Sequence, residues 1–100
     1  MFVEIGSASD VADGEMRVFV VGGTNVNVAN SGGQLYAFDD TCTHMGCSLA
    51  CGELEGTTVT CACHGSQFDV TSGAVLRGPA ARPIRSRAIQ VEGGQLLAEA

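Results

Sequence analysis

Two short stretches rich in soft metal ligands constrain the fold of this chain more than any other feature. The stretch CTHMGC, residues 42–47, contains two cysteines and a histidine, and CACHGS, residues 61–66, contains the same set. We call them the first box and the second box. They hold four of the five cysteines and both histidines of the 100-residue chain. The rest of the chain is therefore expected to act as a scaffold that brings the two boxes together.

The scaffold is predicted to be all-β and to form one domain over residues 1–100. Short β-prone runs alternate with glycine turns, as where MRVFVV at residues 16–21 is followed by Gly22–Gly23. Runs with a period of two, separated by such turns, are typical of antiparallel hairpins. In the next run, Val26 and Val28 are expected to share one face. Both boxes fall in loops between these strands.

The two ends of the chain carry simpler signals. The stretch SASDVA, residues 7–12, is the one place where a helical turn is expected, with Ser7 or Ser9 as its cap. At the other end, IRSRAIQVE and QLLAE flank Gly93–Gly94 and predict a closing hairpin.

The charge of the chain argues against a nucleic-acid partner and leaves open whether it orients a protein partner. The formal net charge is −6 and the chain has no lysine, which excludes the basic footprint that a nucleic-acid-binding protein needs. Residues 1–76 carry nine acids against Arg17 alone. The remaining basic residues all follow: Arg77, Arg82, Arg85 and Arg87. These charges are either simply solvated or form a dipolar surface that orients a charged protein partner.

The first residues, MFVEIGSASDVADGEM, have neither the basic region nor the apolar region of a signal peptide. No apolar run approaches the roughly 20 residues of a membrane span. We therefore expect a cytoplasmic protein without a membrane anchor. In that compartment, paired cysteines indicate a metal site more often than a disulfide framework.

Each box offers one thiolate and one imidazole at close spacing. Cys42 and His44 are separated by one residue, and Cys61 and His64 by two. Four such ligands can hold a single tetrahedral zinc ion. They can equally hold a binuclear iron cluster, with thiolates on one iron and imidazoles on the other. Residue type alone does not decide, because thiolates suit both.

The local sequence favours the cluster. CTHMGC followed by CACHGSQFD closely resembles the two boxes of Rieske [2Fe–2S] proteins, and the resemblance extends from about Tyr36 to Pro83. It implies an all-β Rieske fold, with an antiparallel β-sandwich or barrel-like base. It also implies a cluster-binding subdomain over about residues 40–83, made of two loops.

The resemblance assigns the ligands residue by residue. Cys42 and Cys61 would bind the inner iron of one [2Fe–2S] cluster, and His44 and His64 the outer iron. Two ferric ions, two sulfides, two thiolates and two neutral imidazoles give a neutral oxidised site, and one electron makes it −1. With no substrate pocket indicated beside it, this is a one-electron carrier rather than a catalyst.

Further residues around the cluster follow from the same resemblance. Gly46 and Gly65 would allow tight backbone turns where amides approach the sulfides. Gly78 and Pro79 lie in a stretch that matches the family's proline loop, which covers the far side of the cluster; an ordinary Gly–Pro turn is the alternative. Met45, beside a ligand histidine, is expected either to line the docking face or to pack beneath its loop.

The remaining cysteines and two tuning residues resemble the cytochrome bc type of the family. Cys47 and Cys63 match its disulfide pair, so a disulfide is expected between them. Ser66 matches the residue whose hydroxyl bonds a cluster sulfur, whereas Phe68 replaces a tyrosine and omits one hydrogen bond. Cys51, the fifth cysteine, is expected to be a small apolar filler rather than a ligand or a reactive thiol.

The length and the acidity resemble the Rieske ferredoxins of bacterial ring-hydroxylating oxygenases. This implies that the protein carries electrons from a flavin-dependent ferredoxin reductase to a terminal oxygenase in aromatic hydrocarbon catabolism. A Rieske subunit of another oxidoreductase, such as a cytochrome bc-like complex or the small subunit of a nitrite reductase, is the alternative. A non-redox zinc module is the third possibility. The oxygenase substrate is not encoded here, because its site would lie on another protein.

Overall fold

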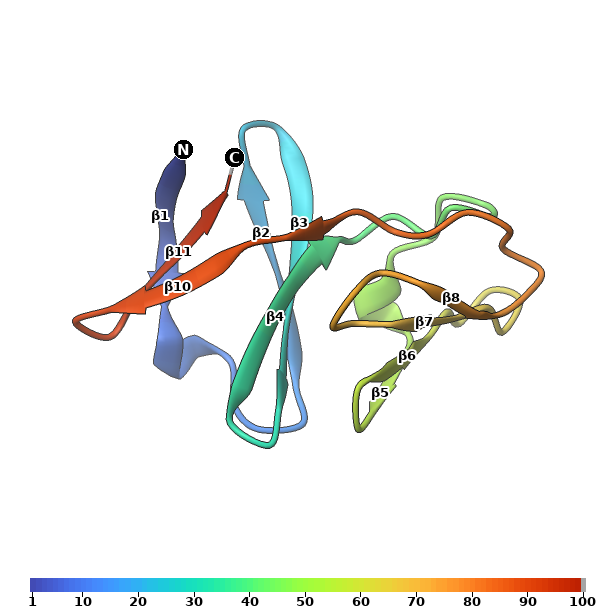
Figure 1. Ribbon diagram of the computed structural model, residues 1–100, viewed down its shortest axis with the longest axis horizontal. Coiled ribbons are helices and arrows are strands. Elements are labelled where there is room, and N and C mark those ends of the chain that lie inside the picture. Colours follow the sequence, from blue (N-terminus) through green and yellow to red (C-terminus); the bar gives the residue numbers. More distant parts are fainter. Residues whose placement is uncertain (100) are drawn as a thin grey trace.

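The computed structural model describes residues 1–99, which form three antiparallel sheets and two short 3₁₀ turns (Figure 1). In chain order the elements are β1 (Phe2–Ser7), η1 (Ala8–Asp10), β2 (Met16–Val21), β3 (Thr24–Ser31), β4 (Gln34–Asp39), η2 (Leu49–Cys51), β5 (Glu53–Glu55), β6 (Thr58–Thr60), β7 (Gln67–Asp69), β8 (Val75–Arg77), β9 (Ser86–Arg87), β10 (Ile89–Glu92) and β11 (Gln95–Glu99). The prediction of an all-β fold is confirmed.

The three sheets follow one another along the long axis of the molecule. At one end lies the sheet β1–β11–β10, and in the middle lies β2–β3–β4–β9; together they form the sandwich-like base. At the other end β5–β6–β7–β8 forms the sheet of the loop subdomain, residues 40–83. The chain returns to the base through β9, which pairs with β4, and β10, which pairs with β11. The two boxes lie at the end remote from both termini (Figure 1).

The strand β3 of the middle sheet is buried on both faces and separates two cores. Val26 and Val28 on β3 point into the base core, as predicted for one face of this strand. Asn27 and Ala29, on the opposite face, are also completely buried. The alternation of a strand explains this, because successive side chains point to opposite sides. The base core consists of Val11, Val21, Val26, Val28, Ala37 and Leu96.

The second core lies beneath the boxes and includes both cysteines that the sequence assigns as cluster ligands. Its members are Ala29, Phe38, Cys42, Leu49, Val59, Cys61, Phe68, Val70, Ala80 and Ile84. It joins one face of the middle sheet to the sheet β5–β8. The loop subdomain is thus anchored by apolar packing on the base and on its own sheet.

The structure refines two sequence-based expectations and adds elements that the sequence did not indicate. The subdomain is more than two loops, because β5 to β8 form a four-stranded sheet under them. The short strands β5 and β8 and the turn η2 had no clear periodic signal. The run IRSRAIQVE is divided into β9 and β10 at Ala88, where the chain passes from one sheet to the next.

The expected helical turn near the N-terminus is confirmed as η1. Ser7 lies at its N-cap, and its backbone N–H donates to the carboxylate of Asp10 at 3.0 Å. Neither 3₁₀ turn in residues 1–99 is long or apolar enough to cross a membrane.

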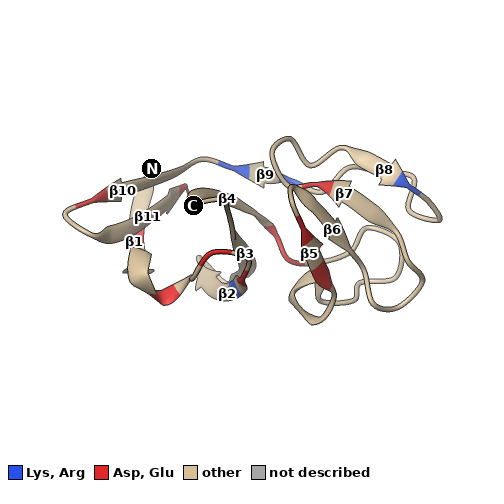
Figure 2. Ribbon diagram, turned by 90° about the horizontal axis from the view of Figure 1, so that it is seen from below, with Lys and Arg blue, Asp and Glu red and all other residues tan. Residues whose placement is uncertain are grey.

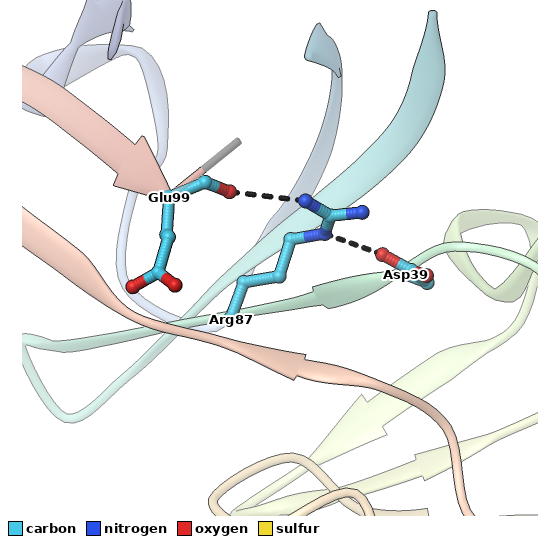
Figure 3. Close-up of polar contacts among 3 residues, drawn as sticks. All are labelled: Asp39, Arg87 and Glu99. Carbon is cyan, nitrogen blue, oxygen red and sulfur yellow. Dashed lines mark hydrogen bonds and ion pairs between the residues drawn. The ribbon is translucent and has the colours of Figure 1, made fainter. Parts of the chain in front are cut away.

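A buried arginine ties the two sheets of the base together at the point where the chain leaves the loop subdomain (Figure 3). The Nε of Arg87 on β9 pairs with the carboxylate of Asp39 on β4 at 2.5 Å. Its Nη1 donates to the backbone carbonyl of Glu99 on β11 at 3.0 Å. The Arg87 side chain is only 5% exposed, so its charge depends on these partners.

Replacing Arg87 by methionine should therefore destabilise the fold by about 2–3 kcal/mol, because it leaves a partly buried carboxylate and a carbonyl without their donor. The free energy of unfolding measured by denaturant titration of the iron-loaded protein tests this. The matched control is Arg17→Met on β2, an exposed arginine, which should change stability by less than about 0.5 kcal/mol. Equal losses in the two variants would contradict the role of Arg87.

Candidate metal centre

The first box is a tight loop closed by its own backbone. The N–H of Cys42 donates to the carbonyl of Cys47 at 2.8 Å, and the N–H of Gly46 donates back to the carbonyl of Cys42 at 2.9 Å. Gly46 has a φ of +77°, a conformation that favours glycine. The loop can therefore reverse direction within six residues, as the glycine in the motif predicted.

The second box repeats this geometry. The N–H of Cys61 donates to the carbonyl of Ser66 at 2.8 Å, the N–H of Gly65 donates to the carbonyl of Cys61 at 3.1 Å, and Gly65 has a φ of +78°. Each box thus begins with a buried cysteine and turns at a glycine four residues later. The two loops form a matched pair, although their intervening residues differ.

A disulfide joins the two loops. It links Cys47 of the first box to Cys63 of the second, across a Cα–Cα distance of 6.6 Å. This is the pair that the sequence predicted. The Sγ atoms of Cys47, Cys61 and Cys63 all lie within 4.8 Å of one another. That trio is not a three-thiolate metal site, however, because the disulfide consumes two of its sulfurs and leaves Cys61 free.

The four predicted ligands divide into a buried pair and an exposed pair. Cys42 and Cys61 are free thiols, each 2% exposed, at the top of the second core. His44 and His64 are exposed, and their ring centroids lie 5.0 Å apart with the planes at 87°. This donor set fits a group held by two thiolates at its inner end and two imidazoles at its outer end, which is the ligand pattern of a Rieske cluster.

The base of the first box is fixed by one buried acid that the sequence analysis did not single out. Asp40 is 3% exposed, and its carboxylate accepts hydrogen bonds from Asn27 Nδ2 and from the backbone N–H of Ala50, both at 2.9 Å. The hydroxyl of Ser48 donates to its other oxygen. Its own carbonyl accepts the N–H of Leu49 at 2.8 Å. Asp40 therefore connects both ends of the loop to β3.

Residues 78–83 cover the boxes and are bonded to both of them. The backbone N–H of Ala80 donates to the Oγ of Ser66, a completely buried serine of the second box, at 3.0 Å. The hydroxyl of Thr43 in the first box donates to the carbonyl of Arg82 at 2.6 Å. The Gly78–Pro79 peptide bond within this segment is cis. The segment that the sequence predicts to cover the cluster is thus hydrogen-bonded to both boxes.

Other predicted residues take distinct positions. Met45 is 62% exposed beside His44, so it does not pack beneath its loop. Phe68 is completely buried in the second core. Cys51 is exposed at the end of η2, which corrects the expectation of an apolar filler. Leu49, at the start of the same turn, occupies the buried position instead.

Sequence reasoning missed Asp40, Thr43 and Ala80. Their contacts join segments that are distant in sequence, such as Thr43 with Arg82, and no local pattern marks them. One signal was present: polar Asn27 lies between two buried valines, and a buried polar side chain requires a partner. Its Nδ2 has Asp40, whereas its Oδ1 lacks a hydrogen-bond donor among the described residues.

Comparison with known proteins gives a consistent result. The family model for the Rieske [2Fe-2S] domain matches residues 1–88. The ferredoxin component of biphenyl 2,3-dioxygenase from Rhodococcus jostii is 36% identical over 96 residues, which cover 96% of this chain and 90% of that protein. A cytochrome b6-f complex iron-sulfur subunit from Chlorobaculum thiosulfatiphilum is 32% identical over 93% of this chain, but over only 50% of its own length.

A solved structure has the same fold and contains a related ferredoxin in complex with an oxygenase. The ferredoxin in the complex of reduced oxygenase and oxidized ferredoxin of carbazole 1,9a-dioxygenase superposes with a TM-score of 0.89 at 33% identity. The match covers 97% of this chain and 91% of that one.

The geometry around Ser66 generates a prediction. Its Oγ accepts the Ala80 N–H, which leaves its own hydrogen free to donate to a cluster sulfur. We expect Ser66→Ala to lower the redox potential, because the reduced, more negative cluster loses a donor. It should also cost about 1–3 kcal/mol of stability by leaving the buried N–H unpaired. Phe68→Tyr, which adds a phenol donor, should raise the potential.

Protein-film voltammetry measures these potentials. The matched control is Ser72→Ala, which removes an equivalent bond from a backbone N–H to a serine Oγ (Ala74 to Ser72, 3.2 Å) on the surface. It should leave the potential unchanged. An unchanged potential in Ser66→Ala would mean that this hydroxyl does not point at the cluster.

Proposed function

The chain belongs to the Rieske [2Fe–2S] family, and on that premise we propose that it carries single electrons from a flavin-dependent ferredoxin reductase to a terminal ring-hydroxylating oxygenase. The observation that supports this most directly is the division of its ligands, with two thiols buried beneath the loops and two imidazoles exposed at the tip. An electron can enter or leave such a site at the surface. The cytoplasm is the compartment we propose, because pyridine nucleotides, the usual source of electrons for flavin-dependent reductases, are kept there.

The chain carries one Rieske cluster, whose chemistry is the reversible storage of one electron. The residues proposed to hold it are Cys42 and Cys61 at the inner iron and His44 and His64 at the outer iron. The site fits this group because both thiols are free and buried, while the two rings lie side by side on the surface. We propose the whole of residues 1–100 as one domain.

The protein's own residues shield the cluster ligands from water and give the electron a route to the surface. The second core and residues 78–83 exclude water from the thiols. The rings of His44 and His64 can each present a second nitrogen to solvent or to a partner. The disulfide and the Asp40 network hold the two loops in a fixed relation, so little reorganisation accompanies the change of charge. The chain is an electron-transfer component rather than an enzyme.

The partners follow from the relatives. The R. jostii relative is the ferredoxin component of a dioxygenase, and the solved ferredoxin is bound to an oxygenase. For this chain we propose a reductase and an oxygenase that use the same tip in turn. Met45, Gly46, Gly65 and Pro79 are all in the loops around the two histidines, and Met45 is the largest exposed apolar side chain among them. The apolar docking contact is therefore assigned to Met45.

A second candidate function is favoured by features of the loops and by one relative. The disulfide between Cys47 and Cys63, together with Ser66, resembles the cytochrome bc type, and the b6-f relative matches almost the whole chain. A Rieske subunit of a quinol-oxidising complex, or of a nitrite reductase, is therefore the alternative. Reduction by a flavin-dependent reductase, rather than by a quinol, distinguishes the proposed carrier from the quinol-oxidising subunit.

The cluster itself is the first test. Purified protein should be red-brown, with about two irons and two acid-labile sulfides per chain and a low average g-value when reduced. His44→Ala and His64→Ala should each lose or distort that EPR signal. Cys51→Ser, which changes an exposed cysteine outside the ligand set, should retain it. Stoichiometric zinc in an anaerobic, iron-replete preparation would end the proposal.

The docking contact is the second test. Met45→Glu should lower the rate of electron transfer to the oxygenase of the same system about tenfold or more, because a charge replaces an apolar contact at the centre of the interface. Val20→Glu is the matched control, since Val20 is 69% exposed on β2, in the base. It should transfer electrons at the wild-type rate. The optical spectrum of the cluster must be unchanged in both. Wild-type transfer by Met45→Glu would place the docking face elsewhere.

A further inference from the structure

The segments that surround the ligands are basic, although the chain as a whole is acidic. Three segments surround the ligands, namely residues 41–51, 61–68 and 75–85, and none of them contains an aspartate or a glutamate. Their only charged side chains, apart from the histidines, are Arg77, Arg82 and Arg85. Removing these three positive charges from the net charge of −6 leaves −9 on the remainder. We call the three residues the arginine collar.

The fold places the collar beside both boxes. Arg77 ends β8 opposite Gln67, the residue that follows the second box. The backbone of Arg82 is bonded to Thr43, between two ligands of the first box. Arg82 and Arg85 line an open hollow of about 490 Å³ whose other walls include Cys42 and Asp39, and the Asp39 carboxylate is already paired with Arg87. Figure 2 shows basic residues along the β8–β9 side, and acids mainly on the base and on β5 and β7.

The collar charges are available to a partner. All three arginines are exposed, and the ion pair formed within residues 1–99 is that of Arg87 with Asp39. Guanidinium groups bind carboxylates through two parallel hydrogen bonds, which suits recognition of acidic side chains. Met45 and Leu76 are 62% and 54% exposed in the same segments. Exposed apolar side chains accompanied by arginines are typical of residues that take part in protein interfaces.

We propose that the arginine collar recognises an acidic docking face on the protein that exchanges electrons with this chain. The inference rests on the proposed function and deepens it, because it specifies the chemistry of the partner's surface. The arginines lie on the β8–β9 side and most of the acids lie on the base and on β5 and β7, so the uneven charge turns the collar towards such a face before contact. A protein of net charge −6 can thereby approach an acidic docking face, which its net charge alone would oppose.

Two small oxidants of opposite charge test the sign of the field at the tip. Each accepts one electron from the reduced cluster: ferricyanide becomes ferrocyanide, and tris(phenanthroline)cobalt(III) becomes the cobalt(II) complex. In stopped-flow experiments the ferricyanide rate constant should fall about fivefold between 10 and 300 mM salt, because screening weakens an attraction. The cobalt rate constant should rise. If net charge governs instead, ferricyanide will accelerate with salt, and the inference is overturned.

Substitutions then test whether the three arginines cause this salt dependence. The triple variant Arg77→Gln, Arg82→Gln, Arg85→Gln should reverse the salt dependence of ferricyanide oxidation. Arg17→Gln removes one positive charge from an exposed position on β2 and should retain the wild-type trend, whereas each single collar variant, such as Arg82→Gln, should weaken it. At low salt the triple variant should also transfer electrons about tenfold more slowly with the reductase or the oxygenase of the system, and the difference should vanish at high salt. Unchanged transfer with both partners would overturn the docking role.

A measurement of anion binding, which involves no electron transfer, tests this inference independently of the proposed function. The paramagnetic anion hexacyanochromate(III) should broaden NMR signals of residues 75–85 in the oxidised protein, and not those of the base or of the triple variant. Broadening spread evenly over the surface would contradict the collar. Retention of the wild-type protein by duplex DNA at 150 mM salt would reassign the surface to a polyanion. Loss of the cluster, by contrast, would refute the carrier function while leaving the anion-binding result intact.

Discussion

The whole tip depends on one constraint: two loops separated in sequence must present their ligands at a fixed relative position. Each loop lacks a sheet partner, so its backbone groups must find hydrogen bonds locally or lose free energy on burial. Both boxes solve this in the same way, with a cysteine N–H and a glycine N–H closing the turn. The disulfide then fixes one loop against the other. Asp40 fixes the first loop to the middle sheet, and residues 78–83 cover the pair.

The layered arrangement explains why such a small chain can support this tip. Because β3 is buried on both faces, it contributes Val26 and Val28 to one core and Ala29 to the other. A single middle sheet thereby stabilises two cores, and the second of them extends up to the thiols of Cys42 and Cys61. Arg87 joins the two sheets of the base to each other, because its side chain connects β9 to β4 and to β11.

The sequence predicted what is encoded locally. The hairpins of the base follow from alternation and glycine turns, and the disulfide pair follows from the resemblance of the two boxes to the cytochrome bc type. The residues that hold the boxes in place were not predictable in the same way. Ala80 reaches Ser66 from fourteen positions away, and Asp40 gains its role from contacts with Asn27 and Ala50. Cys51 was misjudged because Leu49, two residues earlier, fills the core and leaves the cysteine outside.

Buried and exposed charges near the ligands should act on different properties of the carrier. Asp40 is buried two residues before Cys42, where water screens a charge weakly, so we expect a negative charge there to oppose the arrival of an electron and to lower the redox potential. The arginine collar is exposed, so solvent and salt screen its three charges, and we expect it to change the redox potential only slightly. At a distance, however, a partner encounters the collar first. The potential is therefore set mainly by groups beneath the loops, and the encounter rate by groups around them, which lets each be adjusted without the other.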